Sequence, residues 1–137
     1  MPDGFTVLIT DRNRHVRNFL RRELVSEGYQ VEVAADGRDL LRKINTADPP
    51  DLIILDLEIP YSGGPAILER LRRANSKLPV IIHAFATEDE SHPAVKRTAA
   101  FVEKMGNTDR LKATVLAVLR QCYPNRYSTN QRERKEG

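Results

Sequence analysis

Cysteine is nearly absent from this chain of 137 residues, in which Cys122 is the only one. A single cysteine cannot form an internal disulfide, so we expect a fold held by its core and a reducing, cytoplasmic location. No apolar run approaches the roughly 20 residues that a membrane-spanning helix needs. The opening stretch, MPDGFTVLIT, lacks the charged start and long apolar segment of a signal peptide. The sequence therefore excludes a disulfide scaffold and predicts no contact with a membrane.

The charge balance is mildly basic, with a formal net charge of +3 and a pI near 9.2. Part of the excess is concentrated in the polar residues 125–137. The length fits one domain, so we predict a folded domain over residues 1–124 and a polar, basic tail over residues 125–137. A nucleic-acid site on this tail is the weaker alternative, because most short charge runs are simply solvated.

Short apolar runs alternate with segments of helical period along the chain. The apolar runs predict strands over residues 5–10, 30–34, 52–55, 79–82 and 101–102. The first helix is predicted over residues 14–27, with Gly28 as its stop, and later helices follow Asp36, Pro65 and Thr108. Between the last two, Pro93 interrupts a polar segment, which predicts that the fourth helix is short or starts late.

The strict alternation of strand and helix predicts an α/β fold with a parallel sheet. Residues 52–55 read LIIL without polar alternation, which is typical of a strand covered on both faces. A dinucleotide-binding fold needs a glycine-rich turn after the first strand, and the turn here, TDRNR, has no glycine. We therefore predict a flavodoxin-like three-layer sandwich. Its five-stranded parallel sheet has the order 2-1-3-4-5 and is flanked by five helices, of which the fourth is short.

Charged residues follow three of the predicted strands: Asp11 the first, Asp56 the third and Lys104 the fifth. The carboxyl ends of the strands form the ligand edge of such a sheet, so these side chains should converge. A carboxylate there can act as a nucleophile, and an ammonium group can neutralise a phosphoryl oxygen. Taken singly, Asp11 could cap the first helix, Asp56 could be a loop carboxylate and Lys104 a surface lysine. Their combination favours a site for phosphoryl chemistry.

Four stretches of the chain resemble the receiver domains of bacterial two-component systems: VLITDRNRHVRNFLRRELVSEGYQVEVAADGRDLL, PDLIILDLEIPYSGGPAILERLR, LPVIIHAF and FVEK. The resemblance implies that Asp56 is the phosphoacceptor and Lys104 its partner lysine. It also implies that Ala84 and Phe101 occupy the two switch positions. The implied partners are a sensor histidine kinase or phosphotransfer protein as donor and an unknown downstream protein.

The resemblance further implies a Mg²⁺ site made by Asp11, Asp56 and the main-chain carbonyl of Glu58. Receivers usually have a second acid after the first strand, and Arg12 stands there instead. This exchange adds two charge units, each worth on the order of 4 kcal/mol at 4 Å and an effective dielectric of about 20. We therefore expect weak Mg²⁺ binding, with Arg12 close to Asp56. In the alternative, Arg12 points into solvent and Glu58 lends its side chain to the metal.

Two further departures concern the switch and the following loop. Ala84 stands where receivers usually have Thr or Ser, and Met105 stands where a cis proline usually follows the lysine. Two functions remain open on these grounds: a receiver that accepts a phosphoryl group on Asp56, and a degenerate receiver that binds a protein partner without phosphorylation. We predict the first, with no enzymatic activity beyond self-catalysed phosphoryl transfer.

Overall fold

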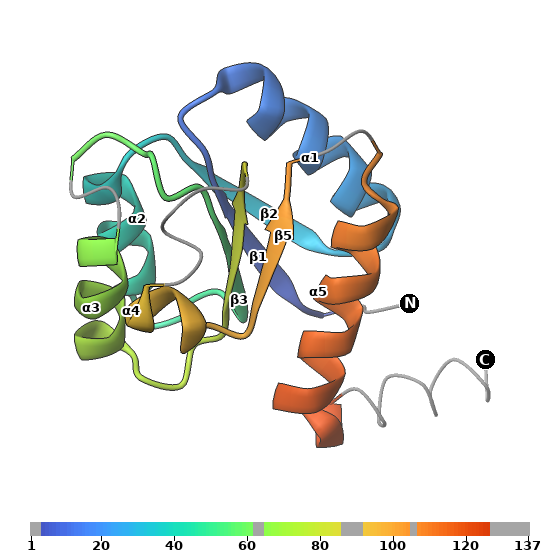
Figure 1. Cartoon of the computed structure of the whole chain (residues 1–137). Helices are drawn as coiled ribbons and strands as arrows, with labels where there is room; N and C mark the ends of the chain where they lie inside the picture. The colour runs from blue at the N-terminus through green and yellow to red at the C-terminus, as the bar shows by residue number, and fades with distance from the viewer. Residues whose placement is uncertain (1–3, 62–64, 86–91, 105–106, 127–137) are drawn as a thin grey trace.

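The computed structural model describes residues 4–61, 65–85, 92–104 and 107–126 (Figure 1). Strands and helices alternate along the chain in the predicted order. The strands are β1 (Thr6–Thr10), β2 (Gln30–Ala34), β3 (Leu52–Leu55), β4 (Val80–Ala84) and β5 (Ala100–Glu103). The helices are α1 (Arg14–Ser26), α2 (Gly37–Ile44), α3 (Pro65–Ala74), α4 (Pro93–Lys96) and α5 (Asp109–Cys122).

All neighbouring strands of the sheet pair in parallel, in the order β2-β1-β3-β4-β5. The predicted flavodoxin-like topology is therefore confirmed. Helices α1 and α5 cover one face, and α2, α3 and α4 cover the other (Figure 1). Because Thr10 pairs with Leu55 in this register, the residues that follow β1 and β3 leave the sheet side by side.

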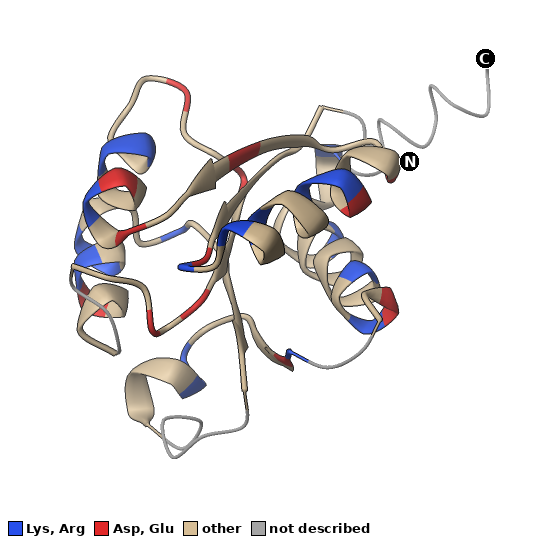
Figure 2. Cartoon of the chain, turned by 90° about the horizontal axis from the view of Figure 1, so that it is seen from above, with Lys and Arg blue, Asp and Glu red and all other residues tan. Residues whose placement is uncertain are grey.

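Each face of the sheet carries its own buried apolar cluster. In β3, Ile53 and Leu55 point into the cluster under α2, α3 and α4, whereas Leu52 and Ile54 point into the cluster under α1 and α5. All four of these side chains are almost completely buried. The apolar run without alternation is thus explained, because neither face of this strand meets water. Figure 2 shows charged residues of both signs on the helices around this sheet.

The helix ends follow the predicted signals, apart from the cap expected at Thr108. Gly28 adopts φ +101° just after α1, a left-handed conformation that glycine tolerates best. The cap of α1 is Asn13 rather than Asp11, since the Asn13 side chain accepts hydrogen bonds from two main-chain N–H groups. Thr108 stands at the start of α5, but within the described part its hydroxyl donates to Glu23 instead of capping the helix. Helix α4 has only four residues, so the prediction of a short fourth helix is confirmed.

The chain after α5 stays in contact with the domain as far as residue 126. Residues 124–126 are helical, and the Arg126 guanidinium lies 2.6 Å from an Asp51 carboxylate oxygen and 4.4 Å from the centre of the Phe5 ring. Arg126 also donates to the Gly4 carbonyl at 2.9 Å. The first residues of the predicted tail are therefore packed on the domain, and residues 127–137 lie outside the described part. Across the described helices, none has the length and apolar character to span a membrane.

Candidate functional site

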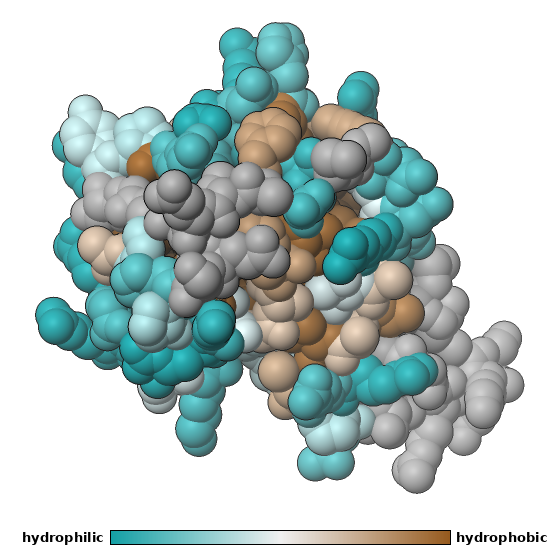
Figure 3. Space-filling model, in the orientation of Figure 1, coloured by the Kyte–Doolittle hydropathy of each residue, from teal (hydrophilic) through white to brown (hydrophobic). Residues whose placement is uncertain are grey.

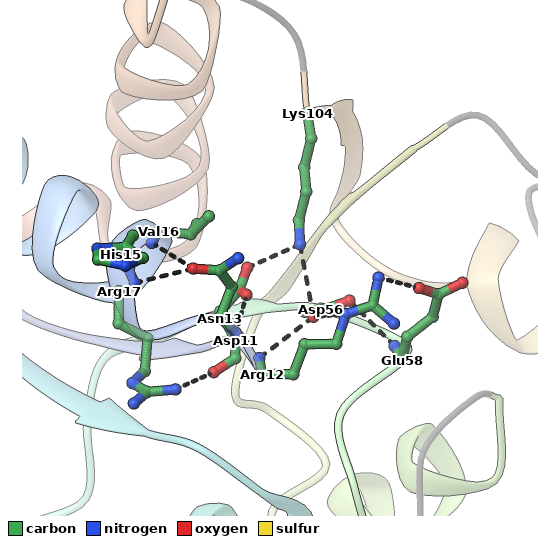
Figure 4. A network of polar contacts seen from close by, with 9 residues as sticks. All are labelled: Asp11, Arg12, Asn13, His15, Val16, Arg17, Asp56, Glu58 and Lys104. Atoms are coloured by element: carbon green, nitrogen blue, oxygen red, sulfur yellow. Dashed lines mark hydrogen bonds and ion pairs between the residues drawn. The ribbon is translucent and has the colours of Figure 1, made fainter.

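Three charged side chains meet where β1, β3 and β5 end (Figure 4). Asp11 and Asp56 are almost fully buried, at 1% and 2% exposure, although each carries a carboxylate. The Lys104 ammonium group reaches between them, 2.8 Å from Asp11 Oδ2 and 3.4 Å from Asp56 Oδ2. The structure thus brings together the three residues that the sequence placed at this edge. One cation shared by two buried carboxylates offsets part of their desolvation cost.

The remaining carboxylate oxygens are held by main-chain N–H groups. Asp11 Oδ1 accepts a hydrogen bond from the Asn13 N–H at 2.8 Å, and Asp56 Oδ1 accepts one from the Glu58 N–H at 3.0 Å. The Arg12 N–H donates to Asp56 Oδ2 at 3.3 Å. These bonds fix the orientation of both carboxylates. Asp56 Oδ2 is left facing the Lys104 ammonium group and the Arg12 backbone, where an anionic group could be received.

Arg12 extends from the β1–α1 loop toward the β3 end of the site. Its guanidinium forms an ion pair with the Glu58 carboxylate, and its Nε lies 3.8 Å from Asp56 Oδ2 (Figure 4). The side chain is 44% exposed, so it borders the site without being locked into it. Arg12 therefore lies close to Asp56, as we expected from the sequence. The alternative arrangement, with Arg12 in solvent and Glu58 free for a metal, is not the one observed.

The donor set at this site does not fit a Mg²⁺ ion in the observed arrangement. Mg²⁺ requires near-octahedral oxygen ligands. Here the carboxylate oxygens of Asp11 and Asp56 already bind N–H groups or Lys104, and the Glu58 carboxylate binds Arg12. Across the described ranges, no group of three or more His, Cys, Asp or Glu side chains could hold a metal ion. A Mg²⁺ ion bound to Asp56 would therefore lie next to the Arg12 guanidinium.

Ala84 and Phe101, which the resemblance assigns to the switch, lie on the face of the sheet that α2, α3 and α4 cover. Ala84 is buried in the cluster on that face, and the Phe101 ring is partly buried against the same cluster. The methyl group of Ala84 offers no hydroxyl toward the site, although its carbonyl accepts a hydrogen bond from the Lys104 N–H at 2.9 Å. Met105, which replaces the usual proline, lies outside the described residues.

His83 lies on the opposite face of the sheet from Ala84 and lines a cavity of about 800 Å³ between α1, β4, β5 and α5. Figure 3 shows apolar surface beside α5 on this side of the molecule. His83 is 8% exposed, and its Nδ1 atom has no hydrogen-bond partner among the described residues. Burial, together with the nearby Lys104 charge, lowers the pKa of His83 to about 4. Sequence reasoning gave His83 no role; a histidine at the end of an otherwise apolar strand was the available signal.

The depressed pKa of His83 predicts acid sensitivity of the fold. The unfolded chain takes up this proton near the ordinary pKa of about 6.5, whereas the folded chain resists it down to about 4. The contribution of neutral His83 to the free energy of unfolding is therefore complete above pH 6.5 and is lost as the pH falls toward 4. We expect His83 to account for a loss of about 2 kcal/mol between about pH 7.5 and about pH 5. Urea denaturation of wild type and His83→Leu should show this loss in wild type alone; equal losses in both proteins would contradict it.

Comparison with known proteins gives a consistent family signal. A family model described as the response regulator receiver domain matches residues 7–116. The chain is 32% identical over 121 residues to the response regulator MprA of Mycolicibacterium vanbaalenii, covering 87% of this chain and 52% of that protein. It is 32% identical over 120 residues to MprA of Mycobacterium tuberculosis, covering 86% and 52%. The chain thus spans about half the length of the curated relatives it matches.

Solved structures show the same fold. The response regulator TrrA of Thermotoga maritima, in complex with Mg²⁺–BeF, has a TM-score of 0.78 at 28% identity and covers 84% of this chain and 99% of its own. The chemotaxis protein CheY4 of Vibrio cholerae has a TM-score of 0.75 at 28% identity, with coverages of 84% and 98%. NtrX of Brucella abortus has a TM-score of 0.79 at 26% identity and covers 94% of this chain, but the match spans only 30% of NtrX.

Proposed function

This chain belongs to the response regulator receiver family of two-component signalling, and we propose that Asp56 is the residue on which it accepts a phosphoryl group. The observation that carries the proposal is the position of Asp56. It is buried at the end of β3, with the Lys104 ammonium group 3.4 Å from its Oδ2 atom. Its main-chain hydrogen bonds hold the carboxylate in one orientation, so the nucleophile is positioned before the donor arrives.

The transfer follows from this geometry. A carboxylate oxygen of Asp56 attacks the phosphorus of a phosphohistidine or of acetyl phosphate, and the bond from phosphorus to the leaving nitrogen or oxygen breaks. The product is an acyl phosphate on Asp56. Lys104 neutralises charge on the phosphoryl oxygens from the β5 side. The donor is a sensor histidine kinase or phosphotransfer protein of the cytoplasm, and a downstream protein reads the product.

The readout belongs to the same proposal and involves Ala84 and Phe101. Both border one buried cluster, so a shift of β4 at Ala84 changes the packing around the Phe101 ring. Ala84 has no hydroxyl to bond the phosphoryl group. A phosphoryl group on Asp56 therefore has to act on β4 through main-chain groups. One such group is the Lys104 N–H, which donates to the Ala84 carbonyl.

Asp56→Asn should abolish covalent labelling by acetyl phosphate. Wild-type protein should gain one phosphoryl group per chain in intact-mass measurements, and the variant should gain none, because an amide cannot form the acyl phosphate. Asp48→Asn is the matched control, since Asp48 is an exposed residue before β3 and should label like wild type. Labelling that survives in Asp56→Asn would place the acceptor elsewhere. A wild-type chain that never labels would favour a protein-interaction module that works without phosphorylation.

A further inference from the structure

We propose that the Arg12 guanidinium takes the place of the divalent cation in this receiver, so that Asp56 is phosphorylated without a metal ion. The inference rests on the proposed function of Asp56 and concerns how that residue is activated. Two contacts support it. Arg12 Nε lies 3.8 Å from Asp56 Oδ2, and the Arg12 backbone N–H donates to the same oxygen at 3.3 Å. This oxygen therefore has cations on two sides, Lys104 from β5 and Arg12 from the loop after β1.

Charge is the first reason why Arg12 can take the place of a divalent cation. Replacing a carboxylate by a guanidinium raises the formal charge of the site by two units, the same increment that one Mg²⁺ ion supplies. The ion pairs at this site join three carboxylates, those of Asp11, Asp56 and Glu58, to the cations Arg12 and Lys104. A divalent cation added to this set would face the positive charge of the Arg12 guanidinium.

Geometry is the second reason. A guanidinium carries five N–H donors in a planar fork, so it can bind one anion through an NH₂ group and still offer other donors to a second anion. Here an Arg12 Nη atom binds the Glu58 carboxylate while Nε faces Asp56. Glu58 thus acts as a positioning residue that holds the fork beside the acceptor. The partial exposure of Arg12 leaves it free to close on a phosphoryl group once the donor is bound.

Labelling with acetyl phosphate in EDTA and in excess Mg²⁺ tests the inference. Wild type should label at nearly the same rate in both. Arg12→Gln should label about 10²-fold more slowly than wild type in EDTA, as expected when one fixed group that stabilises transition-state charge is lost. Arg12→Asp should be equally slow in EDTA and should recover with Mg²⁺, because it restores the missing oxygen ligand. Arg12→Lys, which keeps the charge but loses the fork, should fall between wild type and Arg12→Gln.

Metal binding gives a readout that does not depend on phosphorylation. Titrated Mn²⁺ should leave the amide signals of Asp11 and Asp56 sharp in wild type and broaden them in Arg12→Asp. Wild-type labelling that requires Mg²⁺, or equal broadening by Mn²⁺ in both proteins, would overturn the inference while leaving Asp56 as the acceptor. If wild type labels neither in EDTA nor in Mg²⁺, the proposed function itself fails, and the inference fails with it.

Discussion

Replacing Lys104 with methionine should lower the free energy of unfolding by about 3 kcal/mol, because removing one partner of a buried ion pair leaves uncompensated charge. Lys104 is 11% exposed and is the nearest cation to both Asp11 and Asp56. Without Lys104, Asp11 Oδ2 loses its 2.8 Å contact. The cation that remains near Asp56 is the more distant Arg12 guanidinium. Methionine retains most of the side-chain volume, so the loss reports charge rather than a cavity. Urea denaturation near neutral pH measures it.

Lys96→Met is the control for this experiment, since Lys96 is an exposed residue of α4 and its substitution should change stability little. The double variant Asp56→Asn/Lys104→Met should lose less than Lys104→Met alone, because it buries one carboxylate fewer. This difference gives the coupling between the two side chains. A Lys104→Met protein as stable as wild type would show that water or protonation relieves the two carboxylates without help from lysine.

Alanine substitutions at two neighbouring positions of β3 should both destabilise the fold. Ile54→Ala and Leu55→Ala should each lower the free energy of unfolding by about 3 kcal/mol, since each removes a buried side chain and leaves a cavity. The two residues point to opposite faces of the sheet, and both are at most 1% exposed. Chemical denaturation of the two variants measures the losses.

The edge strand β2 supplies the contrast. Glu32 is exposed, and Glu32→Ala should have almost no effect on stability. If either alanine variant of β3 does not fold, Ile54→Val gives a milder step of about 1 kcal/mol. Tolerance of alanine at one β3 position but not at the other would mean that one face of the sheet is open to water.

The fold could be predicted because its signals are local. Each strand is an apolar run ended by turn residues, and the LIIL run of β3 marks a strand with two covered faces. The site followed from the topology, since the ends of parallel strands lie at one edge whatever their separation in sequence. The convergence of Asp11, Asp56 and Lys104 could therefore be predicted from the sequence.

The features that sequence reasoning missed depend on contacts between distant side chains. Arg126 and Asp51 are 75 positions apart, and no periodic pattern connects an arginine in a polar tail to the start of a strand. The Thr108 hydroxyl binds Glu23 of another helix, a partner that a capping rule based on neighbouring residues does not consider. The missing hydrogen-bond partner of His83 Nδ1 likewise depends on which side chains from α1, β5 and α5 line the cavity, and not on the residues that flank His83 in sequence.

The Arg126 contacts determine where the rest of the chain leaves the domain. Gly4 precedes β1 and Asp51 precedes β3, so Arg126 is anchored at the edge where the strands begin, while Asp56 lies at the edge where they end. Strands of four or five residues separate these edges by roughly 13–17 Å. The chain therefore leaves residue 126 at the edge of the sheet opposite to the edge that carries Asp56. The proposed phosphorylation of Asp56 would therefore have to act across the sheet or along α5 to move the point at which the chain leaves the domain.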